Sequence, residues 1–192
     1  RGLKWHGGVA MKDMATPDPE AVRRGTGNLK NALNIVGMYG LPAVVAINRF
    51  PDDSPEEVAI AREAAIAAGA VGVAEAKGFA EGGDGMTKLA AAVVEAADRP
   101  SDVKLLYNDD DSFFDKVEHM AKSLYLAGDV KWGPMTRTTA RRFADNGWNF
   151  PVCIAKTHLS ISADPKLKGA PSGHTLPIRE LRILAGARLI VT

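Results

Sequence analysis

Along residues 17–40 the apolar positions recur at intervals of three, four or seven residues, which predicts a helix. Its apolar face is formed by Val22, Leu29, Leu33 and Val36. Asp18 stands where an N-cap is needed, because an aspartate side chain accepts a backbone hydrogen bond there. Gly25, Gly27 and Gly37 each cost about 1 kcal/mol relative to alanine inside a helix. We therefore expect this helix to pack closely against another element.

Strand and helix patterns alternate over the following residues. The stretch 41–48, "LPAVVAIN", has the pattern of a buried strand. Ser54 and Pro55 then begin a helical pattern that stops at Gly69. Next come a strand over 70–76, a helix with an apolar stripe over 86–98 and a short strand over 102–107. This order predicts a parallel sheet with right-handed crossovers.

The rest of the chain has a different pattern. Helices are predicted over 112–124, with Ser112 as N-cap, and over 134–146. Strands are predicted over 150–157, 174–184 and 187–192. The fold class is therefore α/β, part of a parallel sheet with flanking helices followed by a smaller α+β subdomain. We place the α/β portion at residues 1–107 and the smaller portion at 108–192.

Composition excludes several classes of function. A formal net charge of +1 over 192 residues gives no electrostatic argument for nucleic-acid binding. The sequence contains no run of eighteen apolar residues, so no membrane span is predicted. Cys153 is the one cysteine, which rules out an internal disulfide and favours a reducing, cytoplasmic compartment. Its apolar surroundings predict a small buried side chain. The four histidines show no zinc-site spacing, so no metal site is predicted.

Familiar nucleotide-binding and hydrolytic motifs are missing from the sequence. It contains no G-x-x-x-x-G-K-[ST] phosphate loop, no G-x-G-x-x-G after a strand and no G-x-S-x-G elbow. A complete nucleotide-hydrolysing site therefore cannot be assembled from these residues by motif.

The stretch "VVAINRF" ends a predicted strand on three side chains that could meet a ligand. Ligands of parallel α/β sheets bind beyond the carboxyl ends of the strands. There Asn48 could read the edge of a purine or pterin, Arg49 could hold an anion, and Phe50 offers a flat apolar face. In the alternative, Asn48 and Arg49 cap the strand and Phe50 packs under a loop.

The loop "AKGFAEGGDG" follows the next predicted strand. Phe79 could approach Phe50 there, so that the two rings sandwich a planar heterocycle. Gly82, Gly83 and Gly85 would permit positive φ and close approach. In the alternative, Phe79 is a core plug and the glycines only form the turn before a helix.

Two further stretches carry weaker signals. "KWHGG" contains His6, and "AKTHLS" places Lys156, Thr157 and His158 at another predicted strand end. A histidine with a structural role is the preferred interpretation of both stretches.

Taken in order, four segments resemble the formate–tetrahydrofolate ligase family. They are "RGLKWHGG", "NLKNALNIVGMYGLPAVVAINRFPDDSPEE", "AEGGDG" and "FPVCIAKTHLSISADPKLKGAPSGHTLPIRELRILAGA". The resemblance runs essentially from Arg1 to Thr192. Members of that family are roughly three times as long, so the chain resembles their carboxyl-side portion without the phosphate-loop part, and the first portion resembles half of a P-loop NTPase.

The resemblance implies roles for individual residues. Phe50 corresponds to the family's folate-pocket phenylalanine, and Gly82 and Gly83 lie in the "AEGG" stretch of that pocket. Phe79 stands where the family usually has a tryptophan that stacks on the pterin, so the ring here is smaller. Asn48 is expected to contact adenine, by analogy with nucleotide-binding folds.

The resemblance also implies a reaction. The family is a ligase of one-carbon metabolism that joins formate to tetrahydrofolate at N10, using ATP with Mg²⁺ through a formyl phosphate intermediate. It implies a homotetramer, activation by a monovalent cation, and an amino-terminal part of the same enzyme as partner. We therefore expect this chain alone to be inactive. The alternatives are a non-catalytic folate-binding or oligomerisation module, and an unrelated α/β nucleotide-binding enzyme.

Overall fold

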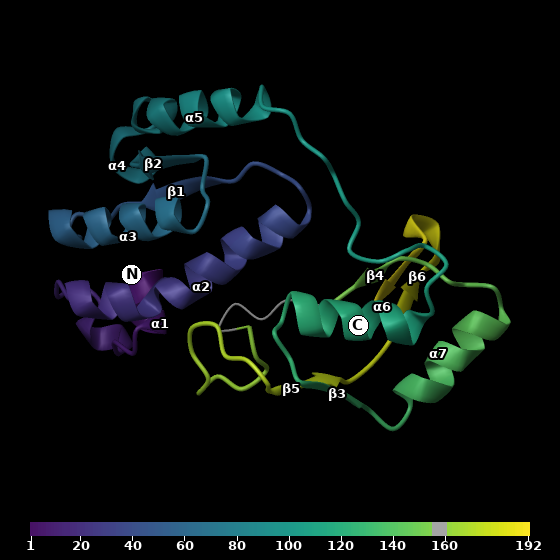
Figure 1. Ribbon diagram of the computed structural model, residues 1–192. Coiled ribbons are helices and arrows are strands. Elements are labelled where there is room, and N and C mark those ends of the chain that lie inside the picture. Colours follow the sequence, from purple (N-terminus) through teal and green to yellow (C-terminus); the bar gives the residue numbers. More distant parts are fainter. Residues whose placement is uncertain (155–160) are drawn as a thin grey trace. The chain divides into compact units, whose positions relative to one another are not determined.

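The computed structural model describes residues 1–154 and 161–192, which divide into two compact units. The first unit is Arg1–Lys104 and the second is Leu105–Thr192 (Figure 1). Both mix helices with small parallel strand pairs, so the predicted α/β fold class is confirmed. Within the described residues, no helix is both long and apolar enough to span a membrane.

The first unit alternates helices and strands along the chain. Its elements are α1 (Gly2–His6), η1 (Met11–Asp13), α2 (Pro19–Met38), β1 (Val44–Asn48), α3 (Pro55–Ala67), β2 (Gly72–Ala76), α4 (Gly78–Glu81), η2 (Asp84–Met86) and α5 (Thr87–Ala97). β1 and β2 pair in parallel, as the alternation predicted. α3 and α5 lie on opposite sides of this strand pair (Figure 1).

The two long helices of this unit begin at caps that the sequence indicates. Asp18 accepts a hydrogen bond from the Ala21 N–H at 2.8 Å and caps α2. Ser54 and Glu57 form a reciprocal capping box at the start of α3, each side chain accepting from the other's backbone N–H. Both predicted caps are confirmed, and the capping box fixes the start of α3 at the end of the turn that follows β1.

Close packing between α1 and α2 depends on glycine. A Cβ on Gly25 of α2 would lie 1.9 Å from the Leu3 carbonyl oxygen, and one on Gly7 would lie 1.9 Å from the Ala21 carbonyl oxygen. The two helices therefore approach backbone to backbone, as expected for a helix that tolerates glycines. Gly37, near the other end of α2, faces open space instead.

We expect Gly25→Ala to lower the free energy of unfolding by about 2 kcal/mol, because the new methyl group has to displace the backbone of α1. Gly37→Ala is the matched control on the same helix. It should leave stability unchanged or raise it by up to about 1 kcal/mol, since alanine is the better helix former. Urea denaturation of both variants measures the difference, and equal stabilities would contradict close packing at Gly25.

The second unit is built around two small sheets. Its elements are α6 (Phe113–Ser123), β3 (Asp129–Trp132), α7 (Thr136–Asp145), β4 (Val152–Cys153), β5 (Thr175–Ile178), β6 (Arg182–Leu184), η3 (Ala185–Ala187) and β7 (Leu189–Val191). β3 pairs with β5 in parallel, while β7 lies between β4 and β6. The core gathers apolar side chains of α6, α7 and the strands, including Val117, Phe143 and Ile190.

A buried lysine of α6 forms hydrogen bonds with the first segment of the second unit. Lys116 of α6 is 1% exposed and donates to the Asp109 carbonyl oxygen at 2.6 Å and to Asn149 Oδ1 at 3.2 Å. The Tyr107 hydroxyl accepts from the Val152 N–H at 3.0 Å. Residues 107–111 are therefore held against α6 and β4 by polar contacts.

Several predictions from the sequence are wrong in whole or in part. Residues 102–107 form no strand: Lys104 N–H donates to the Tyr39 carbonyl oxygen, so the segment follows the end of α2 instead. Cys153 is exposed, because side chains alternate along β4 and Val152 takes the inward position. The apolar stripe expected on α5 is partly solvent-facing, with Val93 49% and Val94 62% exposed.

Candidate functional site

The carboxyl ends of β1 and β2 lie side by side. Asn48 is the register partner of Ala76, and Arg49 N–H donates to the Ala76 carbonyl oxygen at 3.1 Å. The chain segments that carry Phe50 and Phe79 therefore both leave the sheet at the same edge. This edge is the position at which parallel α/β sheets bind ligands.

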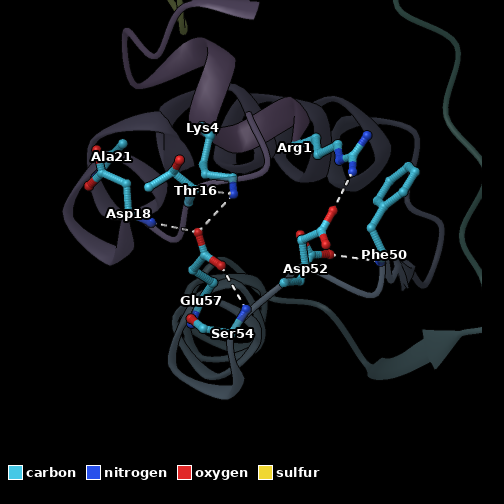
Figure 2. A network of polar contacts seen from close by, with 10 residues as sticks. Arg1, Lys4, Thr16, Asp18, Ala21, Phe50, Asp52, Ser54 and Glu57 are labelled. Atoms are coloured by element: carbon cyan, nitrogen blue, oxygen red, sulfur yellow. Dashed lines mark hydrogen bonds and ion pairs between the residues drawn. The ribbon is translucent and has the colours of Figure 1, made fainter. Parts of the chain in front are cut away.

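Phe50 begins a tight turn between β1 and α3. Its N–H donates to Asp53 Oδ2 at 2.8 Å, and the Asp53 N–H donates back to the Phe50 carbonyl oxygen at 3.1 Å. The Arg1 guanidinium lies 4.3 Å from the centre of the Phe50 ring and pairs with Asp52 at 2.9 Å (Figure 2). The Asp53 hydrogen bonds therefore hold the Phe50 backbone, while the Arg1 guanidinium packs against its half-buried ring.

Asn48 and Phe50 share the wall of one cavity. The cavity has a volume of about 420 Å³ and lies among α1, α2, β1 and α3. Its apolar wall includes Val22, Leu29, Val45, Ile47, Val58 and Ala61, and its polar wall includes Lys4, His6, Asn28, Asp53 and Glu57. A mostly apolar hollow with a few polar groups is the usual form of a small-molecule site.

Phe79 has a different environment from Phe50. It lies on the single turn α4, and its side chain is 102% exposed, so neither Phe50 nor any other described side chain covers its ring. The alternative that Phe79 is a core plug is wrong. Phe79 is also absent from the wall of the cavity that Phe50 lines. Its ring is instead an uncovered aromatic surface beside the strand ends.

The glycines after Phe79 differ from one another. Gly82 has φ +58°, ψ −140°, a conformation that L-residues rarely adopt, and a Cβ there would meet open space. Gly83 has φ −62° and needs no glycine for its backbone. A Cβ on Gly85 would lie 2.8 Å from the Lys77 carbonyl oxygen. The expected positive φ is found at Gly82, whereas Gly85 is needed for close packing against the Lys77 carbonyl group.

Arg49, which the sequence offered as a possible anion-binding or strand-capping residue, pairs with a carboxylate of the neighbouring strand. Its guanidinium contacts Glu75 of β2 at 2.7 Å, and Arg62 of α3 lies 3.8 Å from the same carboxylate. The hydrogen bond from Arg49 lowers the pKa of Glu75 below its ordinary value. Arg49 therefore ties β1 to β2 and is directed at a protein carboxylate, as the strand-capping alternative requires.

The sequence analysis missed a buried ion pair next to this turn. Lys4 of α1 and Glu57 of α3 approach to 3.1 Å with side chains 1% and 5% exposed (Figure 2). Burial by itself would raise the pKa of Glu57, but hydrogen bonds from the Asp18 and Ser54 N–H groups and from Lys4 outweigh it, so the pKa is lowered. The capping-box spacing of Ser54 and Glu57 was the one sequence signal that pointed here.

The lowered pKa of Glu57 predicts a pH dependence of stability. Since the folded-state pKa lies below the ordinary value of 4.5, its contribution is fully present above about pH 4.5 and is lost as pH falls through the folded-state pKa. Glu57→Gln should flatten the acid limb of unfolding free energy against pH. Glu63→Gln, which removes an exposed carboxylate from α3, is the control. Identical acid limbs in both variants would contradict this role for Glu57.

The weaker candidates stay without an assigned role. His6 lines the cavity beside β1. Lys156, Thr157 and His158 lie outside the residues that the structure describes.

Fold and site together define an α/β protein with its candidate ligand residues at the carboxyl ends of a parallel strand pair. The model of the family described as formate–tetrahydrofolate ligase matches residues 1–192. The chain belongs to the formate–tetrahydrofolate ligase family.

Individual relatives of the family also match nearly the whole of this chain. The formate–tetrahydrofolate ligase of Roseiflexus castenholzii is 46% identical over 92% of this chain and 32% of its own length. That of Pelagibacter ubique is 42% identical over 100% of this chain and 34% of its own. The cytoplasmic C-1-tetrahydrofolate synthase of Schizosaccharomyces pombe is 40% identical over 99% of this chain and 21% of its own. The chain thus spans about a third or less of the length of these relatives.

Proposed function

We propose that this chain is part of an ATP-dependent formate–tetrahydrofolate ligase, which formylates tetrahydrofolate at N10 through formyl phosphate, and that it supplies the folate pocket. The family match over residues 1–192 and the names of the relatives support the reaction. A cytoplasmic location is part of the proposal, supported by the name of the Schizosaccharomyces pombe relative.

The observation that carries the folate site is the uncovered ring of Phe79 beside the strand ends. An aromatic side chain that is 102% exposed gains nothing from the core, but it offers a flat face to a planar heterocycle. In the proposal the pterin stacks on Phe79. Gly82 and Gly83, which have open space where a Cβ would stand, let the ligand approach the backbone.

Phe50 and Asn48 contribute from the other strand. Phe50 lines the cavity with its backbone held by the turn to Asp53, and in the proposal its ring forms a second wall of the folate site. Asn48, whose side chain is exposed at the end of β1, provides an amide that can donate and accept at the edge of adenine. The proposal includes contact of both rings, Phe50 and Phe79, with one pterin.

Among the residues that the structure describes, none forms a site that fits the triphosphate of ATP or its Mg²⁺. The sequence has no phosphate loop, and the described residues contain no group of three or more His, Cys, Asp or Glu side chains able to hold a metal ion. In the proposal, the remaining part of the ligase holds the phosphates and the metal. Homo-oligomerisation and activation by a monovalent cation are proposed from family membership alone.

The test compares this chain with the complete ligase polypeptide in an assay for 10-formyltetrahydrofolate. The complete polypeptide should form the product from formate, ATP and tetrahydrofolate, whereas the 192-residue chain should form none. Product formed by the chain alone would overturn the proposal that the remaining part of the ligase holds the phosphates and the metal. Absence of product from the complete polypeptide would overturn the ligase proposal.

A second candidate is a non-catalytic folate-binding or oligomerisation module, favoured by the missing phosphate loop. It predicts that the chain occurs without a partner polypeptide carrying a G-x-x-x-x-G-K-T segment. The intact mass of the native protein, together with the identity of co-purifying chains, distinguishes the two.

A further inference from the structure

The Lys4–Glu57 pair is buried to an extent that stability alone does not explain. Its side chains are 1% and 5% exposed, whereas those of the Arg99–Glu95 pair on α5 are 44% and 74% exposed. Desolvating two charges costs about as much as their attraction returns, and apolar residues of similar volume often serve a core equally well. A buried ion pair that adds little net stability is a candidate for holding chain segments in one specific arrangement.

Glu57 gathers donors from three separate parts of the first unit. Its Oε1 accepts from Lys4 Nζ at 3.1 Å and from the Asp18 N–H at 2.9 Å. Its Oε2 accepts from the Ser54 N–H at 2.8 Å. Lys4 Nζ also donates to the Thr16 carbonyl oxygen at 3.2 Å. One carboxylate therefore connects α1, the turn into α2 and the first turn of α3 (Figure 2).

These contacts reach the Phe50 turn from both sides. Ser54, held by Glu57, directly follows the turn that the Phe50 and Asp53 hydrogen bonds close. Arg1 lies three residues before Lys4 and contacts both the Phe50 ring and Asp52. The pair therefore fixes the carboxyl end of the turn and also the segment that covers its aromatic ring.

We propose that the buried Lys4–Glu57 pair positions the turn that carries Phe50, by locking α1 onto the start of α3. Lys4 and Glu57 are then positioning residues, which act through Phe50 and need not touch a substrate. The consequence for tetrahydrofolate rests on the proposed function, but the positioning of the turn does not.

The test uses the double variant Lys4→Met/Glu57→Gln, which removes both charges without leaving one buried and unpaired. Glutamine keeps an acceptor for the capping box. Amide hydrogen exchange by NMR in the 192-residue chain gives the rates at Phe50 and Asp53 relative to those of β2. We expect both rates to rise at least tenfold relative to β2. A general loss of stability would accelerate all of these amides together and leave the ratio unchanged.

The matched control is Glu95→Gln/Arg99→Gln, which removes an exposed pair from α5 and should leave all the ratios unchanged. A double variant with unchanged ratios at Phe50 and Asp53 overturns the positioning role, as does a turn already unprotected in the unsubstituted chain. The KM for tetrahydrofolate in the complete ligase should rise several-fold with the KM for formate unchanged. A loosened turn with an unchanged KM would uphold the positioning role and reject Phe50 as a folate contact.

Discussion

Lys4→Met alone is expected to lower the free energy of unfolding of the first unit by about 3–5 kcal/mol, the cost of leaving a buried charge without its partner. Glu57 would retain hydrogen bonds from the Asp18 and Ser54 N–H groups but would lose the one opposing charge at 3.1 Å. A urea titration of the 192-residue chain, followed by the NMR amide signals of residues 1–104, measures the loss.

The control for this prediction is Lys88→Met, which removes an exposed ammonium group from α5 of the same unit. It should change the free energy of unfolding by less than about 0.5 kcal/mol. Adding Glu57→Gln to Lys4→Met should restore part of the lost stability, because the uncompensated charge disappears. A loss below about 1 kcal/mol for Lys4→Met would show that Glu57 does not depend on Lys4.

Phe79→Ala is expected to weaken tetrahydrofolate binding to the complete ligase by about 1–3 kcal/mol, or about 5- to 150-fold, if stacking on the pterin resembles aromatic stacking on bases. The fully exposed ring makes no packing contribution, so the free energy of unfolding should stay the same. Calorimetric titration with tetrahydrofolate gives the affinity, and urea denaturation of the 192-residue chain gives the stability.

Two companion variants make the Phe79 prediction specific. Phe79→Trp supplies the larger ring that the family resemblance predicts at this position and should hold or raise the affinity. Ile66→Ala removes a 58% exposed apolar side chain from α3 and should leave the affinity unchanged. An unchanged affinity in Phe79→Ala would reject the stacking role. A loss of affinity in Ile66→Ala as large as that in Phe79→Ala would show that general loss of apolar surface is responsible.

The sequence predicted those elements that local signals specify. The caps of α2 and α3 were identifiable because Asp18 and Ser54 accept hydrogen bonds from residues three positions later. The parallel pairing of β1 with β2 followed from the alternation of strand and helix. The glycines of α2 indicated close packing, which the structure shows at Gly25 but not at Gly37.

What the sequence did not predict depends on contacts between distant residues. Lys4 and Glu57 meet across fifty-three positions, and the capping-box spacing of Glu57 does not reveal that its partner is a buried lysine. β3 is a four-residue strand and was missed, although Val130 and Trp132 alternate as strand residues do. The environments of Phe50 and Phe79 also differ because of tertiary structure: one ring lines a cavity and the other is uncovered.

Fluorescence quenching in the complete ligase tests most directly whether the uncovered ring at position 79 contacts the pterin. Phe79→Trp and Ile66→Trp each add one indole to the first unit, and the emission added by each variant is recorded during titration with tetrahydrofolate. We expect saturable quenching of the indole added at position 79, beyond the ligand's own absorption, and none at position 66. Equal quenching at the two positions would contradict this expectation.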